Sequence, residues 1–324
     1  MPVANGIQWL RMPLPFQLDH INLWLLEQDN GWSIVDTGIG TDVSKDVWRQ
    51  TFADTMAGRP VSQVLVTHLH PDHVGCAGFL TREFDVELHM TREEYMLCRV
   101  LVADTGRPAP EEGLEFYRAA GFPDEALERY RQVFGFFGKL VSPLPQSYVR
   151  LHEGECLTIG NHEWEVLIGR GHSPEHACFL CRDANLLISG DQVLPSISAN
   201  VSVYPTEPES NPLRYWFESL RAIKAQLPED VLVLPAHGKP FRGAHARIDA
   251  LIDEHEVKLD KLFDYLDQPR RAIDVFPALY RIEIPDDQLI LATGEAIAHL
   301  HYLINTGQIQ SETDPNGIIW YHRR

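Results

Sequence analysis

Short apolar runs separated by Gly, Asp and Pro dominate the first ninety residues, and this pattern predicts β-strands. The runs lie at residues 21–26, 32–36 and 64–67, and an Asn30-Gly31 pair between the first two predicts a hairpin turn. Apolar residues at helical spacing over residues 43–55 predict a helix that leads into the third strand. Strands therefore alternate with helices, which is typical of an α/β fold.

The middle of the chain has a different pattern, because helical spacing replaces the strand-like runs. A helical insertion is predicted over about residues 91–148, with helices at residues 93–102, 111–120 and 124–141. Strand-like segments then return, together with one more helix; they lie at residues 157–159, 163–168, 177–181, 186–189 and 231–234, and the helix at 212–226.

The C-terminal segment is mostly helical and ends in a predicted hairpin around residues 314–317. Helices are expected at residues 247–266, 286–291 and 295–306. Helices followed by a hairpin are typical of a winged helix. We therefore predict a catalytic domain over residues 1–245 and a winged-helix-like domain over residues 246–324. A winged helix that reads DNA is basic, whereas this tail is acidic. We therefore expect it to pack against the first domain or to form a homodimer contact.

The overall charge narrows the class of partner. The 324 residues carry a formal net charge of −18, which repels phosphate backbones and anionic membranes. We therefore expect a small-molecule substrate, with no DNA or membrane partner and no RNA. The first sixteen residues lack a basic stretch followed by an apolar one, and five cysteines is an odd number for a disulfide framework. Both observations favour a cytoplasmic protein.

The chemistry concentrates in the segment His68-Leu69-His70-Pro71-Asp72-His73, directly after an apolar run. In an extended chain, His68 and His70 project to the same side and can share one metal ion. Pro71 ends the extension, so that Asp72 and His73 enter a new turn beside a second ion. Imidazole and carboxylate suit Zn²⁺, and also Fe or Mn.

Two ions need more ligands than one segment supplies, and three further donors are present. His172, Asp191 and His237 each stand just past the end of an apolar run. An α/β fold places its functional site at such strand ends. The joint pattern therefore predicts a metal centre built from several strands.

This set of motifs resembles the metallo-β-lactamase superfamily, whose five motifs run Asp, HxHxDH, His, Asp, His. Here they are Asp36, residues 68–73, His172, Asp191 and His237, and the resemblance spans about residues 16 to 242. It implies an αββα sandwich. It also implies that one ion is held by His68, His70 and His172, that the other is held by Asp72, His73 and His237, and that Asp191 bridges the two. Asp36 would not bind an ion itself but would orient these ligands.

Two divalent ions about 3.5–4 Å apart lower the pKa of a shared water toward about 7, so that hydroxide is available at neutral pH. The interpretation is a binuclear hydrolase in which this hydroxide attacks a carbonyl carbon and Asp72 serves as a candidate proton shuttle. No Ser or Cys nucleophile is needed, and Cys76 is predicted to be a small buried residue. His176 is a candidate for orienting a ligand or contacting substrate.

Aromatic residues supply the only clues to substrate. The candidate contacts are Phe136 and Phe137 in the insertion and Tyr204 after Asp191, which favour an ester, lactone or thioester with an apolar portion. A phosphodiesterase or endoribonuclease of the same fold is the alternative, because two metals cleave phosphodiesters as well. A β-lactamase side activity is a further alternative.

Overall fold

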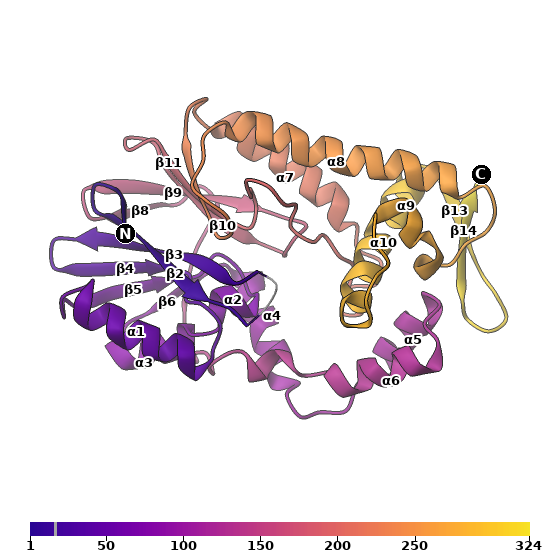
Figure 1. Ribbon diagram of the computed structural model, residues 1–324, viewed down its shortest axis with the longest axis horizontal. Helices are drawn as coiled ribbons and strands as arrows, with labels where there is room; N and C mark the ends of the chain where they lie inside the picture. The colour runs from indigo at the N-terminus through magenta and orange to yellow at the C-terminus, as the bar shows by residue number, and fades with distance from the viewer. Residues whose placement is uncertain (16–17) are drawn as a thin grey trace.

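The computed structural model describes residues 1–15 and 18–324, so residues 16 and 17, where the family resemblance begins, lie outside it. Two β-sheets face each other and helices cover both outer faces (Figure 1). The first sheet has the strand order β1-β2-β3-β4-β5-β6-β7. Its strands are β1 (Pro2–Ala4), β2 (Ile7–Pro13), β3 (His20–Gln28), β4 (Gly31–Val35), β5 (Val61–Leu65), β6 (Leu88–Met90) and β7 (Val149–Arg150).

The second sheet has the order β12-β11-β10-β9-β8, with β12 parallel to β11 and the other pairs antiparallel. A separate hairpin lies near the C-terminus. These strands are β8 (Cys156–Ile159), β9 (His162–Gly169), β10 (His176–Cys181), β11 (Leu186–Gly190), β12 (Leu232–Pro235), β13 (Ile309–Thr313) and β14 (Ile319–Arg323).

The helices fall into an outer layer on each sheet, an insertion and a C-terminal group (Figure 1). The α-helices are α1 (Asp42–Asp54), α2 (Pro71–Val74), α3 (Ala77–Phe84), α4 (Arg92–Ala103), α5 (Glu111–Ala119), α6 (Asp124–Val133), α7 (Pro212–Gln226), α8 (Ala244–Tyr265), α9 (Phe276–Leu279) and α10 (Leu289–Asn305). The 3-10 helices are η1 (Phe137–Lys139), η2 (Ala272–Val275) and η3 (Asp286–Gln288).

Alternation along the strands explains why both faces of each sheet are covered. In β3, Leu23 and Leu25 face the layer of α1, α3 and α4, whereas Trp24 and Leu26 face the second sheet. Side chains in a strand point alternately to opposite faces, so a strand that is apolar throughout needs a partner on each side. The predicted αββα sandwich is therefore confirmed.

The predicted hairpin at Asn30-Gly31 is confirmed, because β3 and β4 pair antiparallel across it. The helix predicted at residues 124–141 was wrong in extent: α6 ends at Val133 and a 3-10 turn follows. Gly135 explains the break, since it has a φ of +71°, and a Cβ on it would lie 2.4 Å from the carbonyl oxygen of Asp104. The strands β1 and β2 and the short strands β6 and β7 were not predicted.

The C-terminal region contains the predicted hairpin, formed by β13 and β14 after α8, α9 and α10. The winged-helix likeness of this region stays a prediction, as does the boundary at residue 245. One apolar core joins Leu180 of β10, Phe217 of α7, Leu251 of α8 and Leu300 of α10. In the described residues, no helix combines the length and apolar character needed to cross a membrane.

Candidate metal centre

The donor residues stand at the ends of five different strands. Asp36 follows β4, the His68–His73 segment follows β5, and His172, Asp191 and His237 come shortly after β9, β11 and β12. Pro71 begins α2, with His70 as the residue before it in extended conformation. The turn that the sequence predicted between His70 and Asp72 is therefore present, and it separates the donors of the segment into two directions.

The first group of donors is His68, His70, His172 and Asp191, whose ligand atoms all lie within 4.8 Å of one another. His68 Nε2 is 2.8 Å from His70 Nδ1 and 3.3 Å from His172 Nε2. Asp191 Oδ2 is 3.4 Å from His172 Nε2. These are the residues that the family resemblance assigns to the first ion, with the bridging aspartate beside them.

The second group is Asp72, His73 and His237, again within 4.8 Å of one another. Asp72 Oδ2 lies 3.3 Å from His237 Nε2 and 3.8 Å from His73 Nε2. Asp191 reaches this group too, since its Oδ2 is 3.5 Å from His73 Nε2 and its Oδ1 is 3.7 Å from His237 Nε2. Asp191 thus lies between the two groups, in the place a bridging ligand would occupy.

Three of the histidines are oriented through the ring nitrogen that faces away from the site. His73 Nδ1 is 2.8 Å from Asp36 Oδ2, His172 Nδ1 is 2.7 Å from the Asn200 carbonyl oxygen, and His237 Nδ1 is 3.2 Å from the His20 carbonyl oxygen. A donated Nδ1–H fixes the tautomer and leaves Nε2 free to bind metal.

Asp36 lies beside His73, and the family resemblance implies an orienting role for it. Besides His73, its carboxylate accepts hydrogen bonds from the backbone N–H and the hydroxyl of Thr67, the residue before His68. It is 2% exposed and has a φ of +60°, a left-handed conformation that is uncommon outside glycine. One carboxylate therefore holds both the start of the HxHxDH segment and its last histidine.

Two atoms at the centre of the site show that the donors fit metal ions. His73 Nε2 and Asp191 Oδ1 are buried and have no hydrogen-bond partner. Leaving a buried polar atom unpaired costs about 1–3 kcal/mol, and both atoms point toward the other donors. Imidazole nitrogens and carboxylate oxygens in this number suit a divalent cation, which would satisfy both atoms.

The electrostatics of the two groups differ. Burial, together with the neighbouring histidines, lowers the pKa of His68 well below its usual value and that of His70 to about 3, so both are neutral. Burial alone would lower the pKa of His73, but the carboxylates of Asp36, Asp191 and Asp72 outweigh it and raise that pKa. The first group thus presents neutral imidazoles, whereas the second concentrates charge.

Glu94 of α4 is a residue that the sequence reasoning missed. Its buried carboxylate accepts the backbone N–H of Leu69, between His68 and His70, at 2.9 Å, and that of Glu175, after His172, at 2.8 Å. Burial raises its pKa to about 7. Its only sequence signal was a carboxylate on the inner face of an amphipathic helix, since Tyr95 and Cys98 beside it are buried.

His176 lies behind the metal ligands rather than among them. Its Nε2 accepts the backbone N–H of Asp191 at 3.1 Å, and its ring stacks on that of His68 at 4.7 Å between centroids. It is fully buried, and burial lowers its pKa well below the usual value. A neutral His176 therefore helps to place Asp191. Its role in contacting substrate stays a prediction.

The remaining predicted positions lie outside the two donor groups. Cys76 is buried, its thiol donates to the Ile39 carbonyl oxygen, and burial raises its pKa to about 12, which suits the structural role predicted for it. Phe137 is partly buried against α4, and Phe136 is 49% exposed beside Lys139. Tyr204 lies on the segment after Asp191, and burial raises its pKa. Their roles in substrate binding stay predictions.

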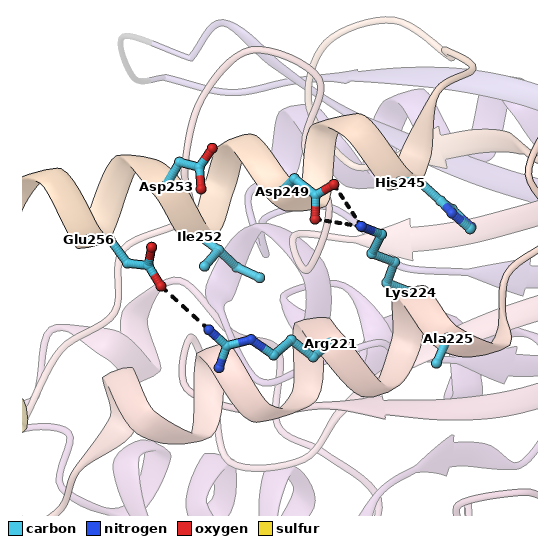
Figure 2. A pocket seen from close by; sticks show the side chains of 8 residues that line it. All are labelled: Arg221, Lys224, Ala225, His245, Asp249, Ile252, Asp253 and Glu256. Atoms are coloured by element: carbon cyan, nitrogen blue, oxygen red, sulfur yellow. Dashed lines mark hydrogen bonds and ion pairs between the residues drawn. The ribbon is translucent and has the colours of Figure 1, made fainter.

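A cavity of about 710 Å³ lies between α7 and α8, away from the donors (Figure 2). Charged pairs cross it: Lys224 contacts both carboxylate oxygens of Asp249 at 2.6 Å, and Arg221 lies 3.5 Å from Glu256. None of the residues around it belongs to the metal centre.

Two family models match the chain: the metallo-beta-lactamase superfamily over residues 17–264, and the metallo-beta-lactamase-like C-terminal domain over residues 259–324. Among solved structures, a beta-lactamase domain protein from Burkholderia ambifaria is 42% identical, with a TM-score of 0.91 over 100% of this chain and 94% of that one.

Two curated relatives are more distant. The probable metallo-hydrolase YqjP of Bacillus subtilis (strain 168) is 25% identical over 323 residues, which is 95% of each chain. The acyl-coenzyme A thioesterase MBLAC2 of Bos taurus is 24% identical over 198 residues, or 59% of this chain and 64% of the thioesterase. With the sandwich, the two donor groups and both family matches in agreement, the chain belongs to the metallo-beta-lactamase superfamily and is a metal-binding hydrolase of that fold.

Proposed function

We propose that the protein is a binuclear zinc hydrolase that cleaves a carbonyl substrate with an apolar acyl portion. An acyl thioester is the favoured substrate, ahead of an ester or a lactone. The observation that carries the proposal is the pair of unpartnered buried atoms, His73 Nε2 and Asp191 Oδ1, at the meeting point of the two donor groups. Iron or manganese would also suit these ligands.

Two bound divalent ions would supply hydroxide at neutral pH and polarise the carbonyl oxygen. The chain's own part is to hold the ligands in the correct protonation state. Asp36 keeps the proton of His73 on Nδ1, the Asn200 carbonyl does the same for His172, and burial keeps His68 neutral. A rigid, prearranged ligand set avoids reorganisation during the reaction.

Asp72 is the candidate proton carrier. Its side chain is 22% exposed, more than that of any other donor in its group, and its Oδ2 lies 3.3 Å from His237 Nε2. It therefore lies where the site opens to solvent, and a carboxylate there can take up the proton that the attacking water or hydroxide releases and pass it to a departing thiolate or alkoxide.

The choice of a thioester rests on a likeness and on charge. The bovine relative is named an acyl-coenzyme A thioesterase, although it is 24% identical and this chain spans 64% of its length. The formal net charge of −18 disfavours a polyanionic nucleic acid. Phe136, Phe137 and Tyr204 remain the candidates for contacting an apolar acyl group.

The test is a substrate panel with zinc-loaded and manganese-loaded protein. It should contain medium-chain acyl thioesters, aryl esters, lactones, a chromogenic β-lactam and bis-nitrophenyl phosphate. We expect the highest kcat/KM on a thioester, and a loss of that activity on chelation. Turnover of the phosphodiester alone would replace the proposal with the nuclease alternative, and turnover of the β-lactam alone would replace it with a lactamase.

A further inference from the structure

The metal ligand His172 is oriented by a segment that the C-terminal helices hold in place. Its Nδ1 donates to the carbonyl oxygen of Asn200 at 2.7 Å. Asn200 belongs to the stretch between β11 and α7, for which no regular secondary structure is assigned over residues 197–204. Such a stretch cannot fix the position of its own carbonyl through a helix or sheet, so its position depends on what packs against it.

The side chain of Asn200 is anchored to α10. Its Nδ2 donates to Glu295 Oε2 at 3.1 Å, and its Oδ1 accepts from the hydroxyl of Ser202. Glu295 is in turn paired with Lys258 of α8, whose Nζ is 2.8 Å from Oε1. The Glu295 side chain is 12% exposed, so water competes little for these contacts, and charge-assisted hydrogen bonds in such surroundings are strong.

The backbone of α10 also comes unusually close to this stretch. The Gly294 carbonyl oxygen accepts the backbone N–H of Val203 at 3.0 Å, and a Cβ on Gly294 would lie 2.8 Å from both Ser202 Cβ and the Val203 carbonyl oxygen. Glycine is therefore required for the approach. It brings the next residue, Glu295, against Asn200.

A second contact fixes the near end of the same stretch. The Ser198 hydroxyl donates to His255 Nε2 at 3.2 Å, His255 Nδ1 lies 3.1 Å from His299 Nε2, and His299 Nδ1 donates to the Glu295 carbonyl oxygen at 2.8 Å. Burial lowers the pKa of both histidines, so one tautomer of each satisfies the whole chain of hydrogen bonds.

We propose that Glu295 is a positioning residue for the metal centre: through Asn200 it sets the orientation of His172, so that the C-terminal helices help to build the site that the first domain carries. The proposal rests on the metal site of the proposed function, not on its substrate. A partner that orients a ligating histidine contributes about 10- to 100-fold in metal affinity, and Glu295 acts one residue further away.

Zinc affinity, measured by competition with a chromophoric chelator, tests the proposal without any substrate. We expect Glu295→Ala to weaken zinc binding about tenfold, the lower end of that range. Glu295→Gln, which keeps an acceptor for Asn200, should recover most of it. The double variant Asn200→Ala/Glu295→Ala should bind zinc no more weakly than Glu295→Ala, because both changes break one contact.

The matched control is Asp249→Ala, which removes a carboxylate paired with a lysine on the outer seam between α7 and α8 (Figure 2). It should leave zinc affinity as in the wild type, and circular dichroism should show that all the variants are folded. Equal zinc affinity for the wild type and Glu295→Ala overturns the proposal, as does an equal loss in Asp249→Ala. The expected zinc pattern without turnover of any carbonyl substrate supports it and refutes the proposed function instead.

Discussion

Two buried histidine clusters stand in the part of the chain that the structure describes, and at first sight they are alike. In the metal centre, His68 Nε2 lies 2.8 Å from His70 Nδ1, and in the C-terminal helices, His255 Nδ1 lies 3.1 Å from His299 Nε2, with Glu295 beside it. Both groups bring donor atoms within 4.8 Å of one another. Proximity alone would assign a metal ion to each.

The difference lies in which atoms have partners. In the C-terminal cluster each ring nitrogen has a hydrogen-bond partner, and Glu295 is neutralised by Lys258. In the metal centre His73 Nε2 and Asp191 Oδ1 have none, although both are buried. Buried polar groups in proteins are normally satisfied. The unsatisfied cluster therefore needs a ligand, whereas the satisfied one is complete as a structural element.

The largest effect that separates the clusters is expected from His70→Ala. Removing a direct ligand should reduce hydrolysis by more than about 100-fold, because it exceeds the loss of a partner that only orients a ligand. Elemental analysis should find less than two metal ions per chain. Full activity in this variant would refute the metal mechanism, and Asp249→Ala, on the seam between α7 and α8, serves as the control with unchanged metal content.

Metal removal should destabilise the protein through the metal centre and not through the C-terminal histidine cluster. A ligand present at 100 to 1,000 times its Kd stabilises the folded state by about 2.7–4.1 kcal/mol, so chelation should lower the free energy of unfolding by about that amount for each ion removed. Urea titrations with and without chelator measure it. The same decrease in wild type and His70→Ala would mean that the ions bind elsewhere.

Glu94 provides a pH test of the packing behind the metal loops. Its pKa is raised by burial from 4.5 to about 7, so the folded state binds this proton more tightly than the unfolded state. Protonated Glu94 therefore contributes about 3 kcal/mol to the free energy of unfolding below about pH 4.5, and this contribution is lost as the pH rises through 7. Glu94→Gln should remove this pH dependence from the metal-free protein. Identical profiles of the free energy of unfolding against pH for the wild type and the variant would contradict this prediction.

The smallest effect is expected in the satisfied cluster. His299→Leu leaves His255 Nδ1 without its partner and should reduce the free energy of unfolding by about 1–3 kcal/mol, with two metal ions still bound per chain. Chemical denaturation and elemental analysis check the two halves of this expectation. Loss of a metal ion even at saturating zinc would show that this cluster is needed for metal binding itself, beyond the ligand orientation that Glu295 provides.

Much of the fold and of the donor set could be predicted because the sequence signals for them are local. The apolar runs of the strands and the spacing of residues 68–73 are properties of short segments. The runs predicted an α/β fold, and the motifs, through the family resemblance that they carry, led to the sandwich and to the donor groups. Glu94 and Asn200 could not be found in this way. Their importance lies in contacts with residues 25 to 95 positions away, which no short pattern contains.

The length of α6 is a case in which the local sequence pattern gave a wrong prediction. Its apolar spacing continues past Val133, but Gly135 has a left-handed conformation, and the carbonyl oxygen of Asp104, 31 residues earlier, occupies the place that a side chain there would need. Tertiary contacts thus overruled a helical pattern that the segment carries by itself.

The helix α8 begins at Ala244, where the two predicted domains meet, and its Ile248 and Leu262 belong to one apolar core with β10, α7 and α10. A core shared in this way makes the segments on either side a single cooperative folding unit, since neither can lose its packing without exposing the other. Because Ile309 and Tyr321 of the terminal hairpin belong to the same core, the long helix and the hairpin would have to be inherited together with the sheet beneath them.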